Sequence, residues 1–210
     1  MIRLEVVQDG CAQAMQMAAK AENRNGRGRL WRRAAWGAAA ALMLLPLLAM
    51  QVTEEVAWDV ADFAIFAAML ISAGGVYELS ARFSASSAYR AAIGLALATA
   101  FLLTWVNLAV GIVGTEDDPA NLLCGGVLAV GIISAFIARF RPAGMARAFF
   151  ATALAQALVA AVAVAAGMGY PASPPLEILA VNALFAMLWL ASASLFRKAA
   201  REKTPAGRAP

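Results

Sequence analysis

Long runs of apolar residues, separated by short polar stretches, dominate the pattern of this chain. Each run approaches the about 20 residues that a helix needs to cross the hydrocarbon core of a bilayer. Breaks this short make consecutive helices antiparallel neighbours. The pattern therefore predicts six transmembrane helices, at residues 34–50, 60–77, 91–114, 121–137, 148–167 and 176–196.

The two ends of the chain are polar and basic. We expect a flexible cytoplasmic tail at residues 1–33, the transmembrane domain at residues 34–196, and a second, shorter cytoplasmic tail at residues 197–210. The first apolar run follows several arginines, as a signal peptide would, but a convincing small-x-small cleavage site is missing. We therefore expect an uncleaved first helix.

The positions of Lys and Arg predict the orientation. If residues 1–33 are placed inside, all 17 Lys and Arg residues fall on the inner side of the six alternating segments. Basic residues are retained on the cytoplasmic side of a membrane. The predicted fold class is therefore all-α, a polytopic membrane helix bundle with both termini inside. Orientation also explains the net charge of +4, so we expect no nucleic-acid partner.

Composition excludes several classes of protein. The chain is 62% hydrophobic and 14% charged, whereas a soluble domain is roughly 45–50% apolar and about 25% charged. It contains no histidine, which excludes histidine-ligated haem, histidine-based metal sites and histidine general-base catalysis within this chain. Its two cysteines, Cys11 and Cys124, form no C-x-x-C pair. We expect neither a cofactor nor a bound metal.

Acidic residues gather on the predicted outer side, where eight of the 13 fall. An outer rim of carboxylates can attract cations. Alternatively, acidic residues are what remains once basic residues are excluded from outer loops, and we favour this interpretation. Pro119 fits the first turn of a helix that the preceding aspartate caps. The predicted rim consists of Asp59, Glu116, Asp117 and Asp118.

A shallow polar pocket is one hypothesis for chemistry. Asp62 lies one turn beyond Asp59, near the outer end of the second segment, where a carboxylate is costly unless it faces the bundle interior or water. Asn107 and Asn182 lie at a similar depth, roughly 10 Å from the outer surface at about 1.5 Å per residue. The alternative is that each amide only joins neighbouring helices, at about 0.6 kcal/mol. For Gln156, the deepest amide, we favour a bond to another helix over the alternative of a substrate contact.

Small residues recur at intervals of four in two of the segments. This spacing permits close approach of helix backbones, so it predicts a tightly packed bundle and a face for self-association or for another membrane protein. The repeats are Ala153, Ala157, Ala161 and Ala165 in the fifth segment, and Gly125 with Ala129 and Gly131 with Ala135 in the fourth.

About the middle third of the chain resembles a group of small bacterial inner-membrane proteins with no assigned activity. The resemblance lies in residues 89–112, with WVNLAVGI, in the acidic loop EDDPAN at 116–121, and in residues 138–158, with ARFRP and ALAQAL. It implies a bacterial inner (plasma) membrane location and nothing about mechanism.

Three function classes follow from these observations. We favour a non-enzymatic membrane protein with a structural or partner-interacting role, in contact with the lipid bilayer. The alternative is a small transporter or cation-responsive protein that uses the acidic rim and the polar pocket. The third is a lipid- or quinone-linked membrane enzyme, which the chain supports least because no nucleophile is paired with a base, although carboxylates alone can still do acid–base work.

Overall fold

A computed structural model describes residues 15, 33, 34, 36–53, 57–83 and 86–203. These residues form six helices of more than one turn and no strand, so the all-helical bundle is confirmed. Five of the helices are long and apolar enough to cross a membrane, while the first, Trp36–Val52, is shorter. That the first helix spans, and that both termini lie inside, stay predictions. Of the predicted tails, only residues 15, 33 and 197–203 are described, and residues 197–203 continue α6 (Pro175–Lys203) beyond the predicted helix end at residue 196.

The chain divides into two compact units at residues 70 and 71, inside one helix. The first unit holds the helix Trp36–Val52 and the start of α2, Val60–Phe83. Trp58, just before α2, packs edge-to-face on Phe63 and Phe66, with ring centroids 5.0 and 5.4 Å apart. These contacts fix the approach of the chain to α2.

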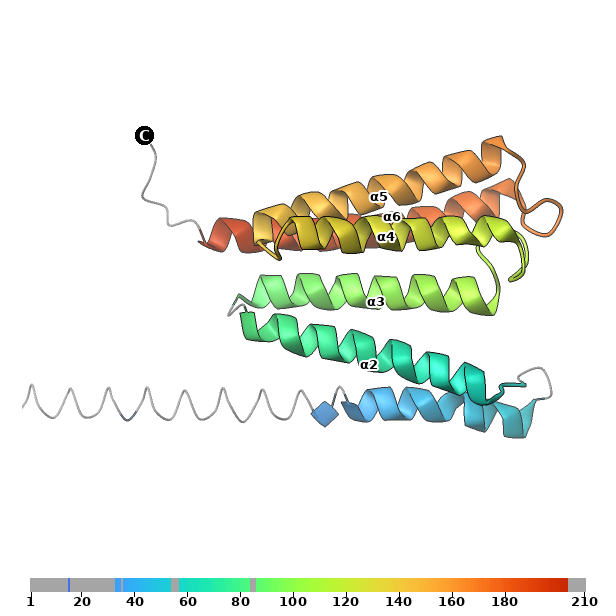
Figure 1. The fold of residues 1–210 in the computed structure, drawn as a ribbon, viewed down its shortest axis with the longest axis horizontal. Coiled ribbons are helices and arrows are strands. Elements are labelled where there is room, and N and C mark those ends of the chain that lie inside the picture. Colours follow the sequence, from blue (N-terminus) through green and yellow to red (C-terminus); the bar gives the residue numbers. More distant parts are fainter. Residues whose placement is uncertain (1–14, 16–32, 35, 54–56, 84–85, 204–210) are drawn as a thin grey trace, which may run out of the picture. The chain divides into compact units, whose positions relative to one another are not determined.

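The second unit holds the rest of α2 and four further helices (Figure 1). Within this unit α6 packs most extensively on α5 and also on α3, and α4 packs on α5. A short 3₁₀ helix, η1, precedes α4. The bounds are α3 Ser87–Ala109, η1 Pro119–Asn121, α4 Leu122–Ile137, α5 Pro142–Ala165 and α6 Pro175–Lys203.

Hydrogen bonds join distant parts of the second unit at both ends of its helices. At one end the Ser86 hydroxyl, before α3, donates to Glu202 Oε2 near the end of α6 at 2.9 Å. About a turn and a half into α3, the Ser192 hydroxyl of α6 donates to the Ala92 carbonyl at 2.9 Å. At the other end Ser173 bonds the backbone of Gly114. These bonds fix the register of the helices.

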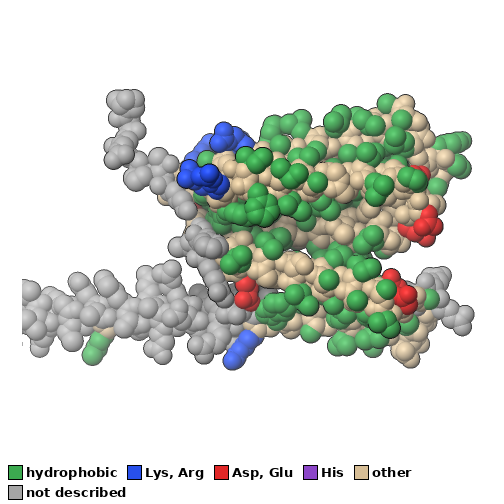
Figure 2. Space-filling model, viewed as in Figure 1, with side chains coloured by type: hydrophobic (Ala, Val, Ile, Leu, Met, Phe, Trp, Pro, Cys, Tyr) green, Lys and Arg blue, Asp and Glu red, His purple; other side chains and the backbone are tan. Residues whose placement is uncertain are grey.

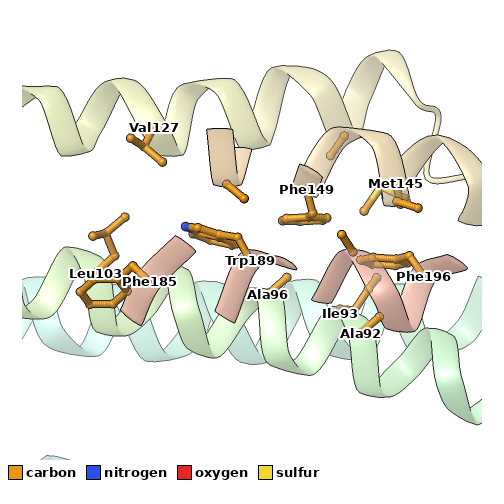
Figure 3. Close-up of a cluster of buried hydrophobic side chains, with 14 of the residues drawn as sticks. Ala92, Ile93, Ala96, Leu103, Val127, Met145, Phe149, Phe185, Trp189 and Phe196 are labelled. Atoms are coloured by element: carbon orange, nitrogen blue, oxygen red, sulfur yellow. The ribbon is translucent and has the colours of Figure 1, made fainter. Parts of the chain in front are cut away.

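Aromatic side chains of α6 fill the centre of the second unit. Trp189 and Phe196 each stack on Phe149 of α5, with centroids 5.6 and 5.4 Å apart and nearly parallel rings. Tyr89 of α3 meets Phe196 edge-on at 5.3 Å. Figure 3 shows the rings of Phe149, Trp189 and Phe196 close together, with Leu103 farther along the same core. The large rings of one helix thus fill the space left by small residues on its neighbours.

The outward surface is apolar, which inverts the arrangement of a soluble protein. On α5, Ala153 is buried while Phe150, Leu154 and Leu158 are exposed. Exposing large apolar side chains to water is unfavourable, whereas hydrocarbon chains accept them without cost. Figure 2 shows the same apolar surface along the helices. The second unit is therefore built for a lipid environment.

The predicted repeats of small residues are only partly buried. Ala153 and Ala135 lie in the core, and Gly131 lies beside Thr152 of α5, where an added Cβ would be 3.3 Å from its hydroxyl oxygen. The other members of the repeats are exposed: Ala157, Ala161 and Ala165 on α5, and Gly125 and Ala129 on α4. On α5 the buried alanines follow a different register, Ala146, Ala148, Ala153, Ala160 and Ala163.

Candidate functional site

Asp59 and Asp62 form a reciprocal cap at the start of α2 in the first unit. Asp59 Oδ1 accepts hydrogen bonds from the backbone N–H groups of Ala61 at 2.7 Å and Asp62 at 2.9 Å. In return, Asp62 Oδ2 accepts from the Asp59 backbone N–H at 2.9 Å. Both residues are exposed. The first N–H groups of a helix lack partners within it, so each carboxylate has a structural role here.

Asn182, the second residue of the predicted pocket, belongs to a buried polar cluster between α5 and α6, which Gln156 joins together. Gln156 Nε2 donates to Asn182 Oδ1 at 2.7 Å, and Trp189 Nε1 donates to Gln156 Oε1 at 3.3 Å. Asn182 Nδ2 donates to the Ile178 carbonyl, one turn back in α6, at 2.8 Å. Gln156 and Asn182 are fully buried. The expectation that Gln156 bonds to another helix is confirmed.

Asn107, the third pocket residue, lies two residues before the end of α3. Its Oδ1 is the single buried side-chain oxygen or nitrogen, among the residues described, that has no hydrogen-bond partner. The apolar run suggested a helix reaching residue 114, but α3 ends at Ala109. At about 1.5 Å per residue, Asn107 is therefore about 3 Å from the end of α3. Asn182, seven residues into α6, is about 10 Å from the start of that helix.

The three predicted pocket residues thus have separate surroundings. Asp62 caps a helix in the first unit, Asn182 bonds to Gln156 and Ile178, and Asn107 keeps an unpaired oxygen. No hydrogen bond joins Asn107 to Asn182. The pocket itself stays a prediction.

Asn121 organises the loop that ends α3 early. Its Oδ1 accepts from the backbone N–H groups of Ile112 at 2.9 Å and Val113 at 3.0 Å, and its Nδ2 donates to the Thr115 carbonyl at 2.6 Å. Ile112 and Val113 are buried. One buried amide therefore satisfies three backbone groups and folds an apolar stretch into a loop instead of another helical turn.

Of the four residues of the predicted acidic rim, two cap helices and two do not. Asp118 Oδ1 accepts from the Ala120 backbone N–H at 2.8 Å, and Pro119 occupies the first turn of η1, as predicted for this sequence. Asp59 caps α2, as described above. Glu116 and Asp117 are exposed in the same loop as Asp118. Among the described residues, no group of three or more acidic or cysteine side chains is placed to hold a metal ion.

At this end of the unit, the loop after α5 is hydrogen-bonded to the loop after α3. The Gly114 backbone N–H donates to Ser173 Oγ at 3.1 Å, and Ser173 Oγ donates to the Gly114 carbonyl at 3.3 Å. Gly169 has a φ of +80°, and a Cβ there would lie 2.6 Å from the Gly114 nitrogen. Only glycine allows the two backbones to approach this closely. The loops that follow α3 and α5 are therefore held together.

Basic side chains in the second unit are separated from the acidic loop along the helices. Figure 2 shows blue side chains gathered at one end, while red ones lie at the opposite end and also at the blue end, where Glu78 is near the end of α2 and Glu202 near the end of α6. Arg139, Arg141, Arg197 and Lys198 lie in or beside the turn between α4 and α5 and the last part of α6, and the acidic loop lies beyond the other ends. The separation is the one on which the predicted orientation depends.

Two residues have contacts that their local sequence indicates only in part. Trp189 was not expected to hydrogen-bond Gln156, although a tryptophan in an apolar helix needs a partner for its N–H when buried. Asn121 was read as a helix start, although its amide follows an Asp-Pro-Ala turn that can fold back. No protein-family model, curated protein or solved structure matches the chain. The resemblance to bacterial inner-membrane proteins stays a prediction.

Proposed function

We propose that this chain is a multi-pass protein of a bacterial inner membrane, with both termini in the cytoplasm and a structural or partner-interacting role. The membrane part is supported by the five long apolar helices and by their exposed large side chains. The orientation is supported by the position of all 17 basic residues on one side of the predicted segments. The bacterial location rests on the sequence resemblance.

One observation supports the structural role: deep polar groups of the second unit form hydrogen bonds with other groups of the same unit. Gln156, Asn182 and Trp189 are joined in one buried cluster, and Thr152 donates to the Ala148 carbonyl of its own helix at 3.0 Å. A transport path needs polar groups that are free to bind the solute at the middle of the bundle. Here these groups serve as contacts between and within helices.

Reconstitution tests this proposal directly. Purified full-length protein in liposomes is compared with protein-free liposomes for the passage of K⁺, Na⁺, Mg²⁺ and protons, detected with enclosed fluorescent indicators. We expect equal rates. A rate above that of empty liposomes, reduced when Gln156 or Asn182 is replaced by leucine, would show that the cluster is a transport path and would overturn the proposal.

Reporter fusions test the orientation independently. Alkaline phosphatase, which is active only outside the cytoplasm, is fused after Arg90, after Asp118 and at the C-terminus, and green fluorescent protein, which folds in the cytoplasm, is fused at the same points. We expect phosphatase activity only after Asp118 and fluorescence at the other two points. Phosphatase activity after Arg90 would contradict the predicted number of spans.

A cation-responsive role is a second candidate, and Asn107 is the observation that favours it. Its buried Oδ1 has no partner among the described residues, and the exposed Glu116 and Asp117 follow in the loop after the same helix. Titration of the purified protein with Ca²⁺ or Mg²⁺, followed by calorimetry, tests this role. Binding that is lost in Asn107→Leu and kept in Leu158→Ala, a change on the exposed side of α5, would support it, and the absence of binding would reject it.

A further inference from the structure

The turn between α4 and α5 holds two consecutive residues in the left-handed backbone region. Arg139 has a φ of 49° and Phe140 a φ of 56°. This conformation costs about 1–2 kcal/mol for a residue other than glycine, so the surrounding structure must hold it. The Tyr89 hydroxyl of α3 donates to the Phe140 carbonyl at 2.8 Å. The side chains of the turn are therefore presented in a defined arrangement.

The same turn combines arginines with exposed aromatic rings. Arg139 and Arg141 are exposed, and neither guanidinium forms a hydrogen bond or ion pair with another residue that the structure describes. Phe136 and Phe140 are 66% and 42% exposed, and their rings meet edge-to-face at 5.6 Å. Cationic side chains beside an apolar aromatic pair are suited to the boundary between lipid phosphates and acyl chains.

No carboxylate on these two helices neutralises the arginines. Between Pro119 and Leu176 the chain contains no aspartate or glutamate, while it contains Arg139, Arg141 and Arg147. The described acidic residues on other elements at this end of the unit are Glu78, near the end of α2, and Glu202 of α6; Glu202 accepts a hydrogen bond from the hydroxyl of Ser86, before α3, and Glu78 also has an interaction partner. The region of the turn is therefore strongly cationic, and guanidinium groups bind phosphate oxygens in pairs.

We propose that this turn binds the phosphate headgroup of an anionic phospholipid, with Arg139 and Arg141 on the phosphate and Phe136 and Phe140 against the acyl chains. The inference rests on the membrane-spanning arrangement of the proposed function, because that arrangement brings the end of α4 to the level of lipid headgroups. It does not depend on which side of the membrane the termini occupy. A lipid fits better than a free anion because the aromatic pair adds an apolar surface beside the arginines.

The test measures lipid binding to the full-length protein in a neutral detergent. Native mass spectrometry gives the affinity for phosphatidylglycerol, for phosphatidylcholine with the same acyl chains, and for inorganic phosphate. The variant is Arg139→Gln with Arg141→Gln. The matched control, Arg197→Gln with Lys198→Gln, removes the same charge from the same end of the unit but leaves the turn intact.

We expect the wild type to prefer phosphatidylglycerol and the turn variant to bind it about thirtyfold more weakly, since each basic residue near an anionic surface contributes about fivefold. The control variant should lose threefold or less. Equal losses in the two variants would show general charge attraction and overturn the site. Binding of inorganic phosphate as tight as that of the lipid would do the same, because the site would then recognise a free anion.

Two further measurements keep the outcome clear. Arg139→Lys with Arg141→Lys keeps the charge, so it should fold like the wild type and bind the lipid with intermediate affinity; wild-type affinity would contradict the predicted paired contacts. Extraction of membranes with alkaline carbonate reports insertion separately. A protein that resists extraction but shows no lipid preference would refute the lipid site alone, whereas an extracted protein would refute the proposed function.

Discussion

Replacing Gln156 with leucine tests how much the buried cluster between α5 and α6 stabilises the bundle. The substitution keeps a side chain of similar size and removes two hydrogen bonds, the 2.7 Å bond to Asn182 and the 3.3 Å bond from Trp189. Hydrogen bonds between helices in membranes contribute about 0.6 kcal/mol on average and at most about 1.7 kcal/mol. The two bonds together therefore account for about 1 kcal/mol.

The larger part of the expected loss comes from the groups left behind. Trp189 Nε1 and Asn182 Oδ1 are buried and would lose their partners in Gln156→Leu. An unsatisfied buried polar group costs about 1–3 kcal/mol. Asn182 keeps the bond from its Nδ2 to the Ile178 carbonyl, which limits its share. We expect the free energy of unfolding to fall by about 2–4 kcal/mol.

A triple variant separates these two causes. In Gln156→Leu with Asn182→Leu and Trp189→Phe no side-chain polar group of the cluster remains, and Phe can keep the stacking position on Phe149. Replacing all partners by apolar groups of the same shape is nearly neutral, although Trp189→Phe also removes some buried volume. The triple variant should therefore be more stable than the single variant.

The assay is reversible unfolding in mixed micelles of dodecyl sulfate and a mild detergent, followed by helical circular dichroism. Leu158→Ala is the control, because this side chain is 63% exposed on α5 and should change the stability by less than about 0.5 kcal/mol. If the triple variant is less stable than Gln156→Leu, the losses are additive and the reasoning from unsatisfied groups is wrong.

Three further substitutions can be checked in the same unfolding assay. Gly169→Ala should destabilise the protein by about 3 kcal/mol or more, because its Cβ would lie 2.6 Å from a backbone nitrogen. Gly167→Ala, with a φ of +65° but nothing within 4 Å of the added Cβ, should cost about 1 kcal/mol. Equal losses in the two variants would contradict the close approach of the two loops. Asn121→Ala should cost about 2–4 kcal/mol and speed hydrogen exchange at the backbone amides it bonds; unchanged exchange would show that the loop holds without it. Gly131→Ala should destabilise the protein by about 1 kcal/mol because Thr152 of α5 lies close to the added Cβ. Gly125→Ala, where nothing lies within 4 Å of the added Cβ, should be neutral or stabilising. If Gly125→Ala were the more destabilising of the two, the wrong face of α4 would have been placed in the core.

The starts of the helices were predicted well where a local signal marks them. Asp118 with Pro119 marked the start of the fourth segment, and the carboxylate of Asp118 caps η1 directly before α4. Capping depends on residues within one turn, so the sequence contains the whole interaction. The second segment was likewise predicted to start at Val60, where α2 begins.

The end of the third segment was wrong for a physical reason. Residues 110–114 are as apolar as a helix that crosses a membrane, and Ile112 and Val113 are indeed buried. Their backbone N–H groups, however, donate to Asn121. The hydrophobic pattern indicates that a segment is buried, but it does not indicate which acceptor each backbone N–H group bonds to. It therefore could not distinguish a buried loop from a further helical turn.

By itself, the sequence determined that this is an all-helical protein with membrane-spanning segments, because the length and apolarity of a segment are properties of that segment alone. Only the tertiary structure decided what its polar residues do. Asn107 and Asn182 are the same amide in similar apolar helices, yet one keeps an unpaired buried oxygen and the other bonds to Gln156. A side chain in the interior acquires its role from the atoms of neighbouring helices, and no local pattern in the chain specifies which atoms those are.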